Sequence, residues 1–106
     1  MARLDVYRNT GPAAGSTPYL LDVQSGWLDG LDTRVVIPLR RLDRFEPVQL
    51  PRRLCPVVCV EGTDCLLETP KLAAVPIRLL RGDAVTSLSG QQTAVDDALD
   101  FLFRGY

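Results

Sequence analysis

The final eighteen residues of this sequence, 89–106, have the periodicity of a single amphipathic helix. Apolar residues recur three or four positions apart and form one stripe, made of Ala94, Val95, Ala98, Leu99 and Leu102. Ser89 and Gln92 have the spacing of a capping box, in which each side chain bonds the backbone N–H of the other residue. We therefore expect a helix that packs through its stripe and ends in an exposed aromatic tail after Phe103.

The residues before this helix have the pattern of short β-strands separated by turns. Alternating or β-branched apolar residues predict strands at 4–7, 19–24, 34–37, 56–60, 65–68 and 75–80. Pro38 is expected to close the third strand, and a two-residue turn at Gly62-Thr63 is expected to pair Val60 with Cys65. Many antiparallel strands followed by one helix indicate an α+β, mostly β, fold: a strongly bent antiparallel sheet or small barrel with one C-terminal α-helix.

Composition restricts the classes of function. With 106 residues the chain is expected to form one domain, and its net charge of −1 gives no bulk attraction for nucleic acid. No apolar run approaches the roughly 18 residues of a membrane span, and the first residues lack the apolar core of a signal peptide, so we expect a cytoplasmic protein. The absence of histidine removes Ser-His-Asp and Cys-His catalysis. We expect no enzymatic activity and no cofactor.

The three cysteines are Cys55, Cys59 and Cys65. An odd number in a chain expected to be cytoplasmic argues against a disulfide framework. A zinc site needs four ligands, and the chain has no histidine to complete one. In the expected hairpin, Cys59 and Cys65 face opposite sides of the sheet. We interpret the cysteines as small buried apolar residues, and metal binding is the alternative.

A basic stretch occupies residues 40–53 and contains five arginines, namely Arg40, Arg41, Arg44, Arg52 and Arg53. A run of this kind is usually a solvated loop. The alternative is a surface that binds an acidic partner.

Five motifs, in their order and spacing, resemble the CcdB toxins. They are Asp22-Val23-Gln24-Ser25, Val35-Val36-Ile37-Pro38-Leu39, Cys55-Pro56-Val57-Val58, Leu72-Ala73-Ala74-Val75-Pro76, and Asp97-Ala98-Leu99 through Phe103 with Gly105. The resemblance implies an SH3-like barrel with a small second sheet and a C-terminal helix, assembled as a homodimer. It implies a toxin of a type II toxin–antitoxin system that binds the A subunit of DNA gyrase and traps the cleaved gyrase–DNA complex. A cognate CcdA-like antitoxin would neutralise it through a disordered acidic segment.

The resemblance also implies which residues contact each partner. The gyrase-binding set comprises Trp27, Leu28, Asp100, Phe103, Arg104, Gly105 and Tyr106. In the family the tail is Trp-Gly-Ile, so Arg104 and Tyr106 depart from it while Gly105 matches. An apolar face of about 200 Å² is lost where Trp becomes Arg104. The antitoxin-binding set comprises Arg8, Asn9, Thr10, Arg40, Arg41 and Arg44.

Each of these positions has a plainer interpretation. Phe103 packs down on Leu99, Trp27 covers an end of the barrel, and Gly105 is an ordinary left-handed cap. Asp100 and Arg104 form a solvated pair worth a few tenths of a kcal/mol. The function has an alternative as well: a domesticated module that binds antitoxin, and co-represses its operon through it, without poisoning gyrase.

Overall fold

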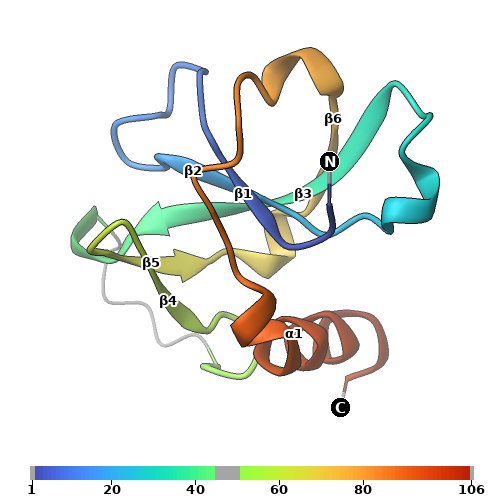
Figure 1. Ribbon diagram of the computed structural model, residues 1–106. Coiled ribbons are helices and arrows are strands. Elements are labelled where there is room, and N and C mark those ends of the chain that lie inside the picture. The colour runs from blue at the N-terminus through green and yellow to red at the C-terminus, as the bar shows by residue number, and fades with distance from the viewer. Residues whose placement is uncertain (1, 45–50, 106) are drawn as a thin grey trace.

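The computed structural model describes residues 2–44 and 51–105, in which seven β-strands form one antiparallel sheet and a helix follows them (Figure 1). The strands are β1 (Asp5–Arg8), β2 (Tyr19–Asp22), β3 (Thr33–Arg41), β4 (Val57–Val60), β5 (Thr63–Leu67), β6 (Ala73–Pro76) and β7 (Thr86–Ser87). Helix α1 spans Gln92–Arg104. Short 3-10 turns occur at Gly26–Leu28, Leu42–Arg44, Thr69–Lys71, Ile77–Leu79 and Ser89–Gln91.

The strands are ordered β4-β5-β3-β2-β1-β7, and β6 pairs with β3 outside this path. The sheet curves into a nearly closed, barrel-like form, and one helix follows it at the C-terminal end of the chain. This arrangement confirms the expected α+β, SH3-like fold. A small second sheet was expected, but the strands of the described residues form one sheet, in which β6 is a branch that pairs with β3. The short strand β7, opposite β1, was not predicted, because two residues carry too little periodicity to recognise.

Strand β3 continues through Pro38, so the prediction that this proline closes the strand is wrong. Residues Thr33–Val36 of β3 pair with β6, and residues Leu39–Arg41 pair with β5. Pro38 lies between these two partners, and its carbonyl accepts a hydrogen bond from Glu68 N at 3.0 Å. The N–H that proline lacks therefore falls at the gap between β6 and β5, where no ladder hydrogen bond is lost.

The hairpin of β4 and β5 has a different register from the predicted one. Val60 pairs with Thr63 and Val58 pairs with Cys65, so the two turn residues are Glu61 and Gly62. Both have positive φ, 51° and 77°, as a type I′ turn requires. Glu61 is not a residue type that signals this conformation. The shift is two residues along β4, and it therefore leaves every side chain on its predicted face.

Two further predictions of local structure are wrong. Strand β6 ends at Pro76 instead of continuing to residue 80, because its partner β3 begins opposite, at Thr33. The chain turns instead, and Leu80 N donates to Ile77 O at 3.0 Å. The capping box is absent from α1: Gln92 N donates to Ser89 O in a 3-10 turn, and no side chain caps the helix. This turn makes Gln92 the first residue of α1 instead of the third, so its side chain does not bond the backbone N–H of Ser89.

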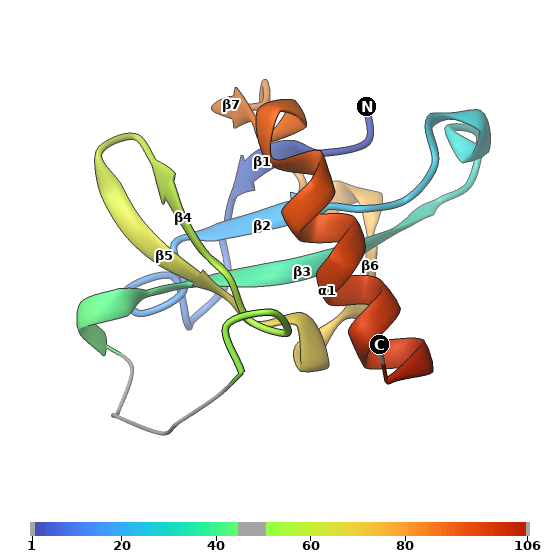
Figure 2. The same ribbon diagram turned by 90° about the horizontal axis from the view of Figure 1, so that it is seen from below.

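The predicted apolar stripe packs α1 against one face of the sheet. Figure 2 shows the helix running diagonally across β2 and β3. Val95 and Ala98 are fully buried, and Val95 joins the main core with Leu21 and Ile37. A valine buried in this way stabilises the fold by about 1.5–3 kcal/mol. An ion pair of 2.7 Å between Arg3 and Asp96 adds a contact at the edge of this packing.

A second, smaller cluster covers the opposite face of the sheet. Tyr7, Leu20, Val36 and Leu80 form it. On the face of the main core, the tip of the β4–β5 hairpin contacts β2, where Glu61 accepts a hydrogen bond from Tyr19 Oη at 2.8 Å. Burial, and then this hydrogen bond, raise the pKa of the Tyr19 hydroxyl.

Candidate functional site

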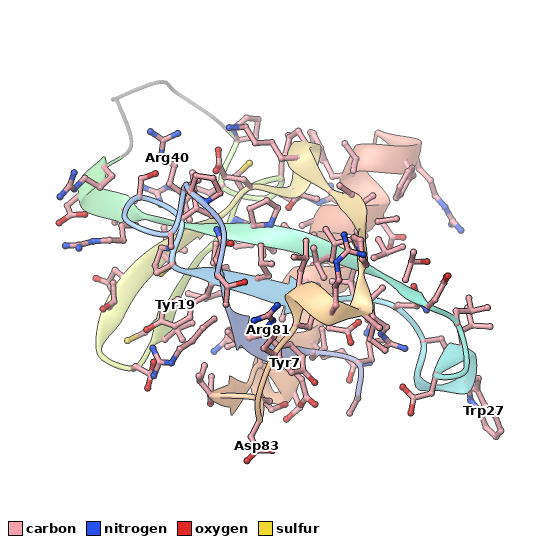
Figure 3. The ribbon with its side chains drawn as sticks, turned by 90° about the horizontal axis from the view of Figure 1, so that it is seen from above. Tyr7, Tyr19, Trp27, Arg40, Arg81 and Asp83 are labelled. Carbon is pink, nitrogen blue, oxygen red and sulfur yellow. The ribbon has the colours of Figure 1, made fainter. Side chains whose placement is uncertain are left out.

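Residues 26–32 lie between β2 and β3 and are all exposed; they are named here the Trp27 loop. The exposed fraction is 97% for Trp27, 48% for Leu28 and 50% for Leu31. Figure 3 shows the Trp27 side chain pointing away from the body of the molecule. Trp27 therefore does not cover an end of the barrel. Leu31 was not predicted as a site residue, and the only signal for it was an apolar residue within the polar segment Asp29-Gly30-Leu31-Asp32.

Beneath this loop lies a buried polar network formed by Asp22, Gln24 and Arg34. The Asp22 and Arg34 side chains are fully buried, and Asp22 Oδ2 lies 2.9 Å from Arg34 Nε and 2.8 Å from Arg34 Nη2. Gln24 is 9% exposed. Burial raises the pKa of the Asp22 carboxyl, whereas the hydrogen bonds from Arg34 and Gln24 act in the opposite direction. Sequence reasoning missed Arg34, because an arginine at a strand start normally indicates a solvated position.

The C-terminal end of α1 forms a second exposed surface. Phe103 is 70% exposed, so it does not pack into the core against Leu99. Gly105 adopts the left-handed conformation, with φ of 78°, and its N–H donates to Phe101 O at 3.0 Å, so it is a cap of α1. Asp100 and Arg104 are exposed, and within the described part of the chain no ion pair joins them. Tyr106 lies outside the described residues.

An arginine from the basic stretch lies against this end of the helix. The guanidinium of Arg53 is 5.4 Å from the centroid of the Phe101 ring. This is a cation–π contact, worth about 0.5–1 kcal/mol at an exposed site. The surface next to the tail is therefore basic as well as apolar, a feature that sequence reasoning did not predict.

The residues predicted to bind gyrase fall on two separate surfaces of one chain. Figures 1 and 2 both place the Trp27 loop well away from the C-terminal end of α1. The first surface has Trp27 and Leu28, and the second has Phe103, Arg104 and Gly105.

The two segments predicted to bind antitoxin lie side by side. Arg41 N, at the end of β3, donates to Ser16 O at 2.8 Å and so joins the basic stretch to the loop that follows β1. Arg40, Arg41 and Arg44 cluster at this end of β3 and are named here the β3-end arginines. Figure 3 shows Arg40 at the opposite end of the molecule from Trp27.

Several of these residues already have partners within the chain. Arg8 pairs with Glu61 at 3.0 Å, and Arg41 makes two bonds to the carboxylate of Asp43, at 3.1 and 2.8 Å. Arg40 donates to Arg44 O through Nε and Nη2. Asn9 is a loop-closing residue: its Nδ2 donates to Thr17 O and its Oδ1 accepts from Gly11 N. Thr10 is exposed in the same loop.

The cysteines do not form one site. Cys55 and Cys65 are buried, as predicted, but Cys59 is exposed on the outer face of β4, so the prediction of burial is wrong for that residue. Cys59 and Cys65 face opposite sides of the sheet, as expected, because Cys59 pairs with Asp64 and Cys65 with Val58. Burial raises the pKa of the Cys65 thiol to about 11. Within residues 2–44 and 51–105, no group of histidine, cysteine, aspartate or glutamate could hold a metal ion.

The helices in the described residues include none that is long and apolar enough to cross a membrane.

Comparison with known proteins identifies one family. A model of the family described as CcdB protein matches residues 3–105. No curated protein matches the chain.

Proposed function

The chain belongs to the CcdB family, whose members are toxins of toxin–antitoxin systems rather than known enzymes, and we propose that it poisons DNA gyrase. In this proposal the toxin binds the A subunit of gyrase and traps the enzyme with its DNA cleaved. It acts by protein–protein contact, without a cofactor or catalysis of its own. The system is of type II, so a cognate protein antitoxin neutralises it, and toxin and antitoxin act in the cytoplasm.

The observation that carries the proposal is the exposure of two aromatic side chains. Trp27 is 97% exposed and Phe103 is 70% exposed, and both stand where family resemblance assigns gyrase contacts. A soluble domain rarely leaves side chains of this size so largely solvated, and tryptophan is one of the residues enriched in binding hot spots. Leu28 and Leu31 enlarge the apolar area around Trp27. Asp100, Arg104, Gly105 and Tyr106 complete the proposed contact set.

We propose that the active form is a homodimer. The Trp27 loop and the tail lie apart on one chain, and a dimer offers gyrase two copies of each surface. Light scattering at micromolar concentration is expected to give the mass of two chains. A monomer mass under these conditions would contradict this part of the proposal.

The proposed antitoxin surface is the end of β3 together with the loop after β1. The β3-end arginines suit an acidic disordered peptide, because arginine forms charge-assisted, bidentate hydrogen bonds with carboxylates. Arg41 would exchange its exposed bond to Asp43 for a bond to the peptide, at small cost because exposed pairs contribute little. Arg8, Asn9 and Thr10 flank this surface. Toxin and antitoxin together would co-repress their operon through DNA contacts made by the antitoxin.

Affinity for purified gyrase A tests the proposal. Trp27→Ala and Phe103→Ala are each expected to weaken binding by about 30-fold or more, the equivalent of ~2 kcal/mol for a hot spot. Leu79→Ala is the matched control, because Leu79 is a partly exposed apolar residue in the 3-10 turn Ile77–Leu79, and Figure 1 shows this turn after β6 on the opposite side of the sheet from α1. Equal effects of all three substitutions, or no effect of the first two, would refute the assignment of these surfaces.

A further inference from the structure

The Trp27 loop has no apolar anchor of its own. Every residue from 26 to 32 is exposed, and the 3-10 turn Gly26–Leu28 buries no side chain. Hydrophobic burial therefore does little to hold the loop in one conformation. A contact surface that is already ordered loses less conformational entropy on binding, so the loop needs another source of order.

The Gln24 side chain joins the loop and the residue after it to the sheet. Its Nε2 donates to Leu28 O, in the first turn of the loop, and to Thr33 O, just after the loop, both at 3.3 Å. Its Oε1 accepts from Val35 N in β3 at 3.0 Å. The side-chain amide of Gln24 thus connects a carbonyl of the loop to the backbone of β3.

Asp22 and Arg34 hold Gln24 in place. Arg34 Nη2 donates to Gln24 O at 3.1 Å, and Asp22 Oδ1 accepts from Gln24 N at 3.0 Å. The same guanidinium reaches toward the loop, with Nη1 3.5 Å from Asp29 Oδ1. That distance is too long for a hydrogen bond, and Arg34 Nη1 is a buried donor without a hydrogen-bond partner in the described chain.

We propose that Asp22, Gln24 and Arg34 are positioning residues that hold the Trp27 loop in the conformation presented to gyrase. Their hydrogen bonds replace the hydrophobic anchor that the loop lacks, while every apolar side chain of the loop remains available to a partner. The part of this inference that concerns gyrase rests on the proposed function. The order of the loop itself can be measured without gyrase.

Trp27 is the only tryptophan of the chain, so its time-resolved fluorescence anisotropy reports on the loop alone. Gln24→Met keeps the size of the side chain and removes its three hydrogen bonds. We expect this variant to show a larger amplitude of fast indole motion, and affinity for gyrase A lowered by about tenfold. Val58→Ala is the control for general destabilisation, because Val58 is buried in the main core on β4. It should change neither quantity.

A second variant covers the case in which Gln24→Met does not fold. Asp29→Asn alters an exposed side chain and removes the charge facing Arg34. It is expected to increase the motion of Trp27 to a smaller extent. Unchanged anisotropy in the folded variants, or an equal change in Val58→Ala, would overturn the positioning role. If Trp27 becomes mobile as expected but the wild-type chain does not bind gyrase A, the positioning role stands and the proposed target is wrong.

Discussion

Deletion of residues 104–106 separates the contribution of the tail to binding from its contribution to stability. Arg104 is the last residue of α1 and Gly105 is its cap, and both are exposed, so the deletion removes the hydrogen bond from Gly105 N to Phe101 O and shortens the last helical turn by one residue. Backbone hydrogen bonds at an exposed helix end lie at the low end of the usual range, about 0.5 kcal/mol each, so the deletion is expected to lower the free energy of unfolding by about 1 kcal/mol. For a domain of this size, such a loss lowers Tm by about 4–8 °C.

The same deletion is expected to weaken gyrase A binding by about 30-fold or more, because it removes a proposed hot spot. Thermal unfolding followed by circular dichroism, and calorimetric titration with gyrase A, measure the two effects on one preparation. The reasoning would be refuted if the deletion unfolded the domain, or lowered its stability by roughly 3 kcal/mol, a loss typical of a removed core side chain. Unchanged affinity would equally show that the tail is not a contact surface.

Four further predictions concern other features of the chain. Arg104→Trp is expected to keep or strengthen gyrase A binding, because it restores a large apolar face; weaker binding would show that the arginine makes a contact of its own. Charge reversal of the β3-end arginines is expected to slow antitoxin association and to flatten its salt dependence in stopped-flow measurements; an unchanged rate would place the antitoxin elsewhere. A maleimide should label Cys59 of the native chain first, because Cys55 and Cys65 are buried. The Cys65 thiol has a pKa raised from 9.0 to about 11, so it ionises first in the unfolded chain, and the free energy of unfolding should fall by roughly 2–3 kcal/mol as the pH rises through this interval. Cys65→Ala should remove that part of the slope, and an unchanged slope would contradict the burial.

Local sequence patterns predicted most of the strands and the helix, but where each strand begins and ends depends on its pairing with other strands. The apolar stripe of α1 and the β-branched runs were sufficient to locate the helix and most strands. Pro38 was misread because its tolerance depends on two strands, β5 and β6, that share one side of β3. The hairpin register was predicted wrongly because Glu61 adopts a positive φ, and glutamate is not a residue type that indicates this conformation.

The exposed residues of the candidate site could be proposed from the sequence, but the buried polar residues beneath the Trp27 loop could not. Trp27 and Phe103 were singled out, and the structure removes the interpretation that either is a core residue. Arg34 could not be recognised as buried, because its burial depends on the carboxylate of Asp22, twelve positions away in the sequence. Side chains that act through such a partner carry no local signal.

Formation of the cleaved gyrase–DNA complex by purified components tests the central claim most directly. The chain is added to gyrase and supercoiled circular DNA, gyrase is then denatured, and the amount of linear DNA released from cleaved complexes is measured. The account predicts that linear DNA accumulates with the wild-type chain, that Trp27→Ala and the 104–106 deletion reduce it, and that Leu79→Ala does not. A wild-type chain that is folded and binds its antitoxin, yet yields no linear DNA, would contradict the claim.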